Sequence, residues 1–433
     1  MSLLQKKLAE KIEAHRPRTR KLVKEHGNTV LGEVTVAQAI GGMRGVKSLV
    51  TDISYLDPME GIRFRGMTIP ETLAALPKPE GKEAPYVEGH IWLLLTGEIP
   101  NKEEIAEIVE EFKKRGQVPA YVYDQLRSMP RDSHPMVMFS TAILAMQRDS
   151  KFTAAYNKGL NKMTAWEPML EDSLDLLARL PTIAAYIYRI KYQGDTTIVP
   201  DADQDMGGKF AQMMGVDAPY DELMRLYFIL HSDHESGNAS AHTTHLVGST
   251  LSDAFYSLTA GMCALAGPLH GLANQEVLRW IQGVYDKLGG KVPTKEELTK
   301  FVWETLDSGQ VIPGYGHAVL RKTDPRYEEQ RKFCLKHLPD DEIFQVVSML
   351  YDIVPPALEK QGKAKNPWPN VDAQSGVIQW HYGVTEYDFY TVLFGVGRAI
   401  GVLANLVWDR ALGYALERPK SLTTEMLENI VAK

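Results

Sequence analysis

The sequence is poor in cysteine: its 433 residues include two, Cys263 and Cys334. Two thiols cannot form a disulfide framework or a cysteine-rich zinc site, so reduced and buried cysteines are expected. The first twenty residues lack the continuous apolar core of a secretory signal, and acidic residues interrupt their basic ones. Neither a secretory signal nor a typical transit peptide is therefore predicted at this end.

Long hydrophobic runs and an excess of positive charge are missing as well. No stretch of about 18 uncharged apolar residues occurs, which predicts that the chain does not span a membrane. The nearest candidate, residues 391–408, carries Arg398 in its middle. Lysine and arginine number 48 against 55 aspartates and glutamates, for a net charge of −7. This balance argues against a role of the whole protein on nucleic acids or a membrane surface.

Strand–helix alternation, repeats of fixed period and Ser/Gly-rich linkers are not found either. Apolar residues make up 44% of the chain, an ordinary globular value, and mostly recur at helical spacing. We therefore expect a mostly α fold in which any second domain is inserted rather than tethered. The expected local features are a first helix interrupted at Pro17, a short helix ending at Gly27, a strand pair within residues 29–46, and helices starting at Asn101, over 172–192 with a break at Pro181, over 223–231, over 249–265, and from Leu272 to Gly289.

Four histidines stand close together in the sequence HSDHESGNASAHTTH: His231, His234, His242 and His245. Helical spacing of histidines is typical of metal ligands. The zincin motif, however, needs a second histidine four residues after the first with a glutamate between them, and residues 234–238 do not supply it. Satisfied core histidines or an anion-binding imidazole are favoured, and a metal-dependent hydrolase stays an alternative.

Two further histidines stand beside glycines. His270, in AGPLHGLANQEVL, comes just before a predicted helix, whose positive end disfavours an imidazolium. A neutral His270 could donate a hydrogen bond to a carbonyl oxygen, or it could simply pack at the helix start. His317 follows Gly314 and Gly316 in VIPGYGHAVLRKTDPRY. Because Arg321 and other basic residues come next, this segment suits a phosphate-bearing ligand, with a solvated basic face as the alternative.

Two charged residues stand in otherwise apolar surroundings. Asp372, in GKAKNPWPNVDAQSG, precedes an apolar segment and could be a helix cap. Arg398 lies in FGVGRAIG, whose glycines miss the dinucleotide-binding fingerprint by one residue. No acid lies within four residues of Arg398, so a bound carboxylate is a fair partner. Two histidines, one aspartate and several arginines, without a nucleophilic serine or a cysteine pair, suit acid–base chemistry on a polycarboxylate with a phosphorylated carrier.

These motifs, in this order and spacing, closely resemble the citrate synthase family, and the resemblance extends over nearly the whole chain. It includes GGMRG at 41–45, EGIRFRG at 60–66, WLLLTGEIP at 92–100 and LERPKS at 416–421. The form it looks like is the dimeric one best known from mitochondria, which some bacteria also carry. The resemblance implies a nearly all-helical homodimer with a large domain of residues 1–271 and 382–433. A small domain, residues 272–381, would be inserted, and the cleft between the two would close on oxaloacetate.

The resemblance also implies a role for each matching residue. Asp372 would remove a proton from the methyl group of acetyl-CoA, His270 would donate to the thioester oxygen, and His317 would protonate the carbonyl of oxaloacetate. The implied oxaloacetate and citrate ligands are His234, Arg326, Arg398 and, from the partner subunit, Arg418. The implied CoA-binding residues are Arg44 from the other subunit, Lys162, Val311, Gly314, Gly316, Arg321, Lys363, Lys365 and Asn370.

Several alternatives remain open at this point. A 2-methylcitrate synthase would use propionyl-CoA with the same machinery, and one methylene is worth only about 1–3 kcal/mol of discrimination. A helical interaction protein without catalysis is a third reading, beside the metal-dependent hydrolase. We expect no permanently bound cofactor, no metal, no nucleic acid and no membrane. The expected location is a bacterial cytoplasm, or the mitochondrial matrix if the chain is a processed form.

Overall fold

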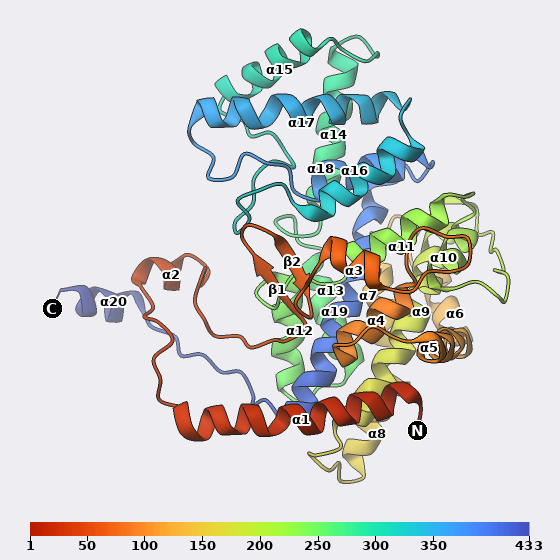
Figure 1. The fold of residues 1–433 in the computed structure, drawn as a ribbon, viewed down its shortest axis with the longest axis vertical. Coiled ribbons are helices and arrows are strands. Elements are labelled where there is room, and N and C mark those ends of the chain that lie inside the picture. The colour runs from red at the N-terminus through yellow and green to blue at the C-terminus, as the bar shows by residue number, and fades with distance from the viewer. Residues whose placement is uncertain (433) are drawn as a thin grey trace.

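The computed structural model describes residues 1–432 and is mostly helical, as predicted, with one small antiparallel sheet (Figure 1). The elements of the first half are α1 (Leu3–His26), α2 (Val36–Ile40), β1 (Ser54–Asp57), β2 (Gly61–Phe64), β3 (Met67–Thr68), α3 (Ile69–Ala75), α4 (Val87–Thr96), α5 (Lys102–Arg115), α6 (Ala120–Ser128), α7 (Pro135–Ala145), the 3₁₀ helix η1 (Met146–Asp149), α8 (Lys151–Asn157), α9 (Trp166–Tyr192) and α10 (Met206–Met214). Those of the second half are α11 (Tyr220–Leu230), α12 (Ala239–Ser249), α13 (Ala254–Leu265), α14 (Ala273–Lys287), α15 (Lys295–Asp307), α16 (Pro325–His337), α17 (Glu342–Gln361), α18 (Asp372–His381), η2 (Tyr387–Phe389), α19 (Tyr390–Leu412) and α20 (Thr424–Val431).

Helix α19 is the centre of the core. It packs against α9, α4, α11, α12 and α13, and nearly all its residues are buried. A helix that is apolar on all sides is stable in water only when other elements surround it. Residues Tyr387–Leu412 are long and apolar enough to cross a bilayer, but this apolar stretch is wholly buried inside the fold. We therefore interpret α19 as a core helix.

Helices α14 to α18 form a separate group at the top of Figure 1. They pack chiefly on one another, α14 on α18 and α17, and α15 on α17. The group reaches the rest of the fold through α16, which contacts α11 and α3. The backbone N–H of Arg321 also donates to the carbonyl of Pro58, in the β1–β2 turn, at 2.8 Å. These helices fall within the stretch expected as the inserted domain, whose boundaries stay a prediction.

Three local predictions were wrong. Helix α1 continues through Pro17, because a surface helix loses one backbone hydrogen bond at a proline and solvent can satisfy the freed carbonyl. Its start is also fixed by a capping box between Ser2 and Gln5. Helix α9 likewise continues through Pro181. Residues 29–46 contain the short helix α2 instead of a strand pair, and they are mostly exposed, so their β-branched residues have no sheet to join.

Other local predictions were right or nearly so. Asn101 caps α5 by accepting from the backbone N–H groups of Glu103 and Glu104. Helix α14 ends just before Gly289. The helix expected over 249–265 begins only at Ala254, because Asp253 caps it there and α12 ends at Ser249. Such side-chain caps are readable in the sequence because they act within one helical turn.

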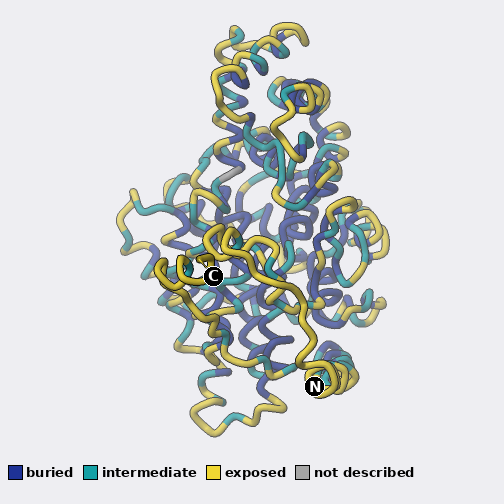
Figure 2. The backbone as a smooth tube through the Cα atoms, turned by 90° about the vertical axis from the view of Figure 1, so that its left-hand side faces the viewer, coloured by how far each residue is buried: buried dark blue, intermediate teal, exposed yellow. Residues whose placement is uncertain are grey.

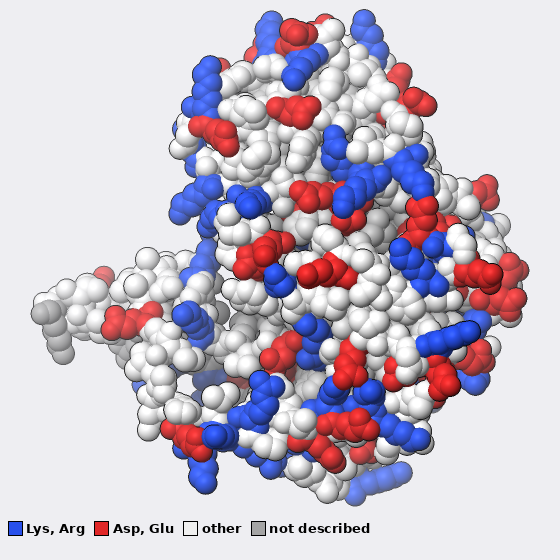
Figure 3. All heavy atoms as spheres, viewed as in Figure 1, with Lys and Arg blue, Asp and Glu red and all other residues white. Residues whose placement is uncertain are grey.

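Two exposed arms leave the body. Residues 27–52 and 413–432 are mostly exposed, and Figure 2 shows both as long yellow stretches. They present large apolar side chains to solvent, among them Ile40, Val50, Met426 and Ile430. Elsewhere on the surface, acidic and basic side chains are interspersed over the face shown in Figure 3. Exposed apolar residues gathered on projecting segments are typical of an interaction surface.

Candidate active site

The expected catalytic and substrate-binding residues come from both parts of the fold. His234 lies in the α11–α12 loop, His270 in the loop before α14, and Arg398 in the middle of α19. The upper helices supply His317 from the α15–α16 loop, Arg326 from the start of α16 and Asp372 from the start of α18. The rings of His234 and His317 meet edge to face with their centres 5.4 Å apart. The positive charges of Arg326 and Arg398 both act on the Asp372 carboxylate. Six residues distant in sequence therefore converge.

His270 is held in one neutral tautomer. Its Nε2 accepts a hydrogen bond from the backbone N–H of Ser240 at 3.2 Å and lies 2.9 Å from the Ser240 hydroxyl. A backbone N–H can only donate, so Nε2 carries no proton and Nδ1 carries it. Burial, helped by the charge of Arg398, lowers the pKa of His270 to about 4. His270 is therefore neutral at pH 7, as expected, but the helix that fixes it is α12 and not α14.

His317 has the opposite tautomer. Its Nδ1 accepts from the backbone N–H groups of Val319 and Leu320, both at 3.0 Å. The proton of the neutral ring is therefore on Nε2. Burial, followed by the charge of Arg326, lowers the pKa of His317 to about 4. The two rings thus hold N–H donors whose positions the backbone dictates, one through Nδ1 and one through Nε2.

Asp372 is the first residue of α18 but does not cap it. The cap position is Val371, and no side chain closes the helix start there. The Asp372 carboxylate makes no hydrogen bond to another described residue, while its backbone N–H donates to Asn370 at 2.9 Å. Burial raises the pKa of Asp372 to about 6, although Arg326 and Arg398 pull it down. A carboxylate that is costly to keep ionised is a stronger base than one in water.

Arg398 is 1% exposed and has no carboxylate partner within ion-pair distance in residues 1–432. Its Nη1 donates to the amide oxygen of Asn238 at 2.8 Å, and its guanidinium lies 4.9 Å from the centre of the Phe394 ring. Burial lowers the pKa of Arg398 to about 10. A buried cation with so little compensation is a natural receptor for a bound carboxylate.

The glycines around Arg398 have a packing role instead of a dinucleotide-binding one. A Cβ at Gly401 would come within 2.4 Å of the Asp233 Cβ, and one at Gly397 within 3.1 Å of the His231 Cβ. Glycine therefore lets the 231–234 turn lie directly on α19. Burial, followed by the nearby Arg326, His317 and Arg398, holds the pKa of His234 well below its ordinary value.

Arg326 differs from Arg398 in having an internal partner. Its guanidinium is bidentate to Asp324, with Nη2 to Oδ2 at 2.7 Å and Nε to Oδ1 at 3.1 Å. Asp324 is buried, and it also caps α16 through the backbone N–H of Arg326. Sequence reasoning missed Asp324, although an aspartate before a proline at a helix start is a visible cap signal. It also missed Asn238 and Ser240, which no local signal marks as partners of Arg398 and His270.

The expected CoA-binding loops pair with each other. Gly316 donates its backbone N–H to Trp368 at 3.0 Å, and Asn370 donates its own to the carbonyl of Gly314 at 2.9 Å. Gly314 has a φ of +81°, and a Cβ there would lie 2.7 Å from Ala373, so only glycine fits. Val311 is exposed beside them. The exposed lysines 363 and 365 belong to the second loop, and the Arg321 guanidinium donates to nearby backbone carbonyls, those of residues 318–320.

Three expected ligands are not brought to this site within one chain. Arg44 lies on the exposed arm after α2, and Arg418 lies on the C-terminal arm. Lys162 is exposed in the α8–α9 loop, next to Met163, whose carbonyl accepts from Arg16 of α1. Figure 1 shows α2 and α20 projecting to one side and α8 at the far end from the upper helices. The assignment of Arg44 and Arg418 to a partner's site, and that of Lys162 to CoA, stay predictions.

The histidine cluster at 231–245 is divided among different partners. His231 bonds to the Tyr227 carbonyl at 2.9 Å, His242 to Glu417 at 2.8 Å and His245 to Asp409 at 2.8 Å. Across residues 1–432, no group of three or more histidines, cysteines and acidic residues is arranged to hold a metal ion. The arrangement does not favour the metal-dependent hydrolase.

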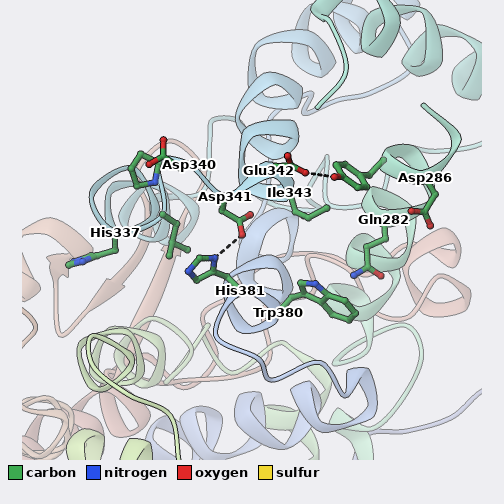
Figure 4. Close-up of a pocket in the computed structure, with 12 residues that line it drawn as sticks. Gln282, Asp286, His337, Asp340, Asp341, Glu342, Ile343, Trp380 and His381 are labelled. Carbon is green, nitrogen blue, oxygen red and sulfur yellow. Dashed lines mark hydrogen bonds and ion pairs between the residues drawn. The ribbon is translucent and has the colours of Figure 1, made fainter. Parts of the chain in front are cut away.

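A separate cavity lies at the edge of the upper helices, lined by residues of α14, the α16–α17 turn and α18 (Figure 4). His381 bonds there to Asp341 at 2.7 Å, and Tyr285 donates to Glu342. None of the expected site residues lines it.

Comparison with known proteins agrees with the geometry. The model of the "Citrate synthase, C-terminal domain" family matches residues 42–420. "Probable citrate synthase, mitochondrial" of Glossina morsitans morsitans is 54% identical over 434 residues, covering 100% of this chain and 93% of the relative. "Citrate synthase, mitochondrial" of Daucus carota is 54% identical over 429 residues, covering 98% and 90%. The expected bacterial cytoplasmic location finds no support in these names, which agree with the mitochondrial alternative.

Solved structures give the same result. The crystal structure of citrate synthase from Pyrobaculum aerophilum superposes with a TM-score of 0.77 at 27% identity, covering 89% of this chain and 92% of that one. The fold is thus that of a solved citrate synthase. Family match, curated relatives and fold together show that this chain belongs to the citrate synthase family and is an enzyme, a transferase of the citrate synthase type.

Proposed function

We propose that this protein condenses acetyl-CoA with oxaloacetate and water to give citrate and CoA, and that it works as a homodimer. The observation that carries the proposal is the pair of opposite tautomers. His270 has its proton on Nδ1 and His317 has its proton on Nε2, and the half-buried carboxylate of Asp372 has a raised pKa. Two neutral donors and one base are what an enolisation followed by addition to a ketone requires.

In the first step, Asp372 removes a proton from the methyl group of acetyl-CoA. The Nδ1–H of His270 donates to the thioester oxygen, which gains charge as the enol or enolate forms. A carboxylate with the ordinary pKa of about 3.9 would be a weak base for this task. The raised pKa of Asp372, about 6, reduces the difference in pKa between this carboxyl group and the methyl group of acetyl-CoA. A fixed donor such as His270 contributes on the order of 10²–10³ in rate.

In the second step, the methylene carbon attacks the keto carbon of oxaloacetate, and a carbon–carbon bond forms. The Nε2–H of His317 supplies the proton to the former keto oxygen. Arg326, Arg398 and His234 hold the carboxylates of oxaloacetate, together with Arg418 of the partner subunit. Water then cleaves the thioester of citryl-CoA, so that citrate and CoA leave. No metal or permanent cofactor takes part in this scheme.

Closure of two domains would assemble the site. Residues 272–381 supply His317, Arg326 and Asp372, while the rest of the chain supplies His234, His270 and Arg398. If the inserted domain moves relative to the large one, the base and the enol-stabilising donor come together only in the closed state. Such closure would keep water out until citryl-CoA has formed.

The homodimer would complete each site. The exposed arms carry Arg44 and Arg418, and Lys162 is exposed on the body. All three lie away from the active site of their own chain. The exposed apolar side chains of the arms suit contact with a second copy. Arg44 and Lys162 would bind CoA phosphates, alongside the paired loops around Gly314 and Asn370. A mitochondrial location is part of this proposal, and the names of the relatives support it.

The test is the release of free thiol from acetyl-CoA by the purified full chain. We expect release that depends on oxaloacetate, with citrate as the second product. Release that ignores oxaloacetate, or no release from an intact dimer, would refute the proposal. The same assay with propionyl-CoA separates this activity from 2-methylcitrate synthesis. The acyl-CoA with the higher kcat/KM is the preferred substrate.

A further inference from the structure

The C-terminal arm, residues 413–432, is attached to the body at one point. Gly413 and Tyr414 still belong to the end of α19, because their backbone N–H groups donate to the Asp409 carbonyl at 3.0 and 3.1 Å. Beyond Tyr414, every hydrogen bond and ion pair between the arm and the body, within the part of the chain described, passes through Glu417. The next residue is Arg418.

Glu417 is held by three residues of α12. The Nε2–H of His242 donates to its Oε1 at 2.8 Å, and the Nε2 of His245 lies 3.7 Å from its Oε2. Its backbone N–H donates to the hydroxyl of Ser249 at 3.1 Å. All three partners belong to α12, where His242 and His245 are three residues apart and so lie on one face. We call His242, His245, Asp409 and Glu417 the clasp.

Asp409 anchors the clasp from the other side. It is buried near the end of α19 and accepts from the Nδ1–H of His245 at 2.8 Å. That hydrogen bond raises the pKa of His245. Arg410, also buried, has no hydrogen-bond partner for its Nε in residues 1–432, and its charge acts on the same histidine. The clasp is therefore a partly buried cluster in which Asp409 accepts a hydrogen bond from His245 and Glu417 accepts one from His242.

The helix that grips Glu417 also fixes the active site. The first turn of α12 holds His270 through Ser240, and Asn238, just before it, holds Arg398. His242, His245 and Ser249, further along the same helix, hold the arm. A rigid helix therefore fixes the direction of the arm relative to the catalytic residues of its own subunit.

We propose that Glu417, held by the clasp, is a positioning residue that aims Arg418 into the oxaloacetate site of the partner subunit. Without the clasp, the arm would pivot at residues 413–414, and Arg418 would have to be ordered anew each time oxaloacetate binds. This inference rests on the proposed function, in which Arg418 completes the partner's site. The proposal assigns a function to His242 and His245, which take no part in the catalytic scheme.

The test compares KM for oxaloacetate with kcat in full-length variants. Glu417→Ala should raise KM by about tenfold, the effect of losing charge-assisted hydrogen bonds, with kcat within about twofold of the parent. Glu417→Gln keeps the acceptor for His242 and should recover most of the loss. Lys420→Ala is the matched control, since Lys420 is exposed on the same arm outside the clasp, and it should leave both constants unchanged. Sedimentation and thermal unfolding should show intact dimers throughout.

A double-mutant cycle makes the test sharper. His242→Ala should raise KM like Glu417→Ala, and the double variant should be no worse than the single one, because the same contact is broken. Multiplying effects, or single variants with unchanged KM, would overturn the role of the clasp. Arg418→Ala distinguishes the role of Arg418 from that of the clasp. If it leaves KM unchanged, the assignment of Arg418 itself fails. If it raises KM and Glu417→Ala does not, only the clasp is refuted.

Discussion

The interior of the active site and the two exposed arms differ in what a single chain can complete. Inside, the backbone of Ser240, Val319 and Leu320 fixes the two catalytic rings, and Asn238 orients Arg398. On the arms, Arg44 and Arg418 face solvent and bind no site residue of their own chain. Burial therefore sets the pKa and protonation of the interior groups within one chain. The arm residues, in contrast, can bind a substrate only when a second copy of the chain supplies the rest of the site.

The largest expected effect is at the base inside the site. Asp372→Asn keeps the shape of the side chain but removes the base, so we expect kcat to fall by about 10³–10⁴-fold or more. Asp352→Asn, an exposed aspartate on α17, is the matched control and should keep full activity. The measurement is thiol release under saturating substrates. Near-normal turnover in Asp372→Asn would mean that the carboxylate of residue 372 is not the base.

The second largest effect is expected for dimers that combine a defect on the arm with a defect in the interior of the site. Arg418→Ala and Asp372→Asn dimers should each be poorly active, but mixing and reassociating their subunits should restore about a quarter of the parental sites. Each mixed dimer joins an intact Asp372 in one subunit to an intact Arg418 from the other. Mixed samples no more active than their components would show that Arg418 serves its own chain or no site.

The pH dependence should report the interior groups in a defined order. Asp372 must be ionised to act as a base, and burial raises its pKa to about 6. His270 and His317, with pKa values near 4, are already neutral there. We therefore expect kcat/KM to fall about tenfold per pH unit below 6, following one proton. A profile that is flat down to pH 5 would contradict the raised pKa of the carboxylate.

The smallest effect concerns stability. Burial raises the pKa of Asp372 in the folded state above the ordinary value of 3.8, so ionisation favours the unfolded chain as the pH rises between these values. The ionised carboxylate therefore costs the fold stability at pH 8 and not at pH 3.5. Asp372→Asn should unfold at a higher temperature than the parent at pH 8, with a smaller difference at low pH. Calorimetry at the two pH values checks the sign.

Part of the fold was readable because its causes are local. Asn101 caps α5 through residues two and three positions away, and the end of α14 lies beside two glycines. The breaks predicted at Pro17 and Pro181 were wrong because a helix tolerates one missing backbone hydrogen bond. At Pro17 solvent can satisfy the freed carbonyl, and α9 is held by its packing on α19. The strand pair expected within 29–46 failed since β-branched residues need a neighbouring strand, and an exposed arm offers none.

In the candidate site, too, some features were predictable from the sequence and others required the structure. The residue types at 270, 317 and 372, in motifs that resemble one family, already indicate acid–base chemistry on a thioester and a keto acid. The sequence alone therefore determined a mostly helical enzyme of that family. Only the tertiary structure decided which nitrogen of each histidine carries the proton, which helix fixes His270, and that Arg326 has a carboxylate partner while Arg398 has none. Ser240 lies 30 residues from His270 and Asn238 lies 160 residues from Arg398 in the sequence, yet each contact is about 3 Å long. The partners of His317 and Arg326 are only two or three residues away, but the loop conformation that joins them forms with the fold. Burial, in turn, changes the free energy of a charge only after the chain has folded.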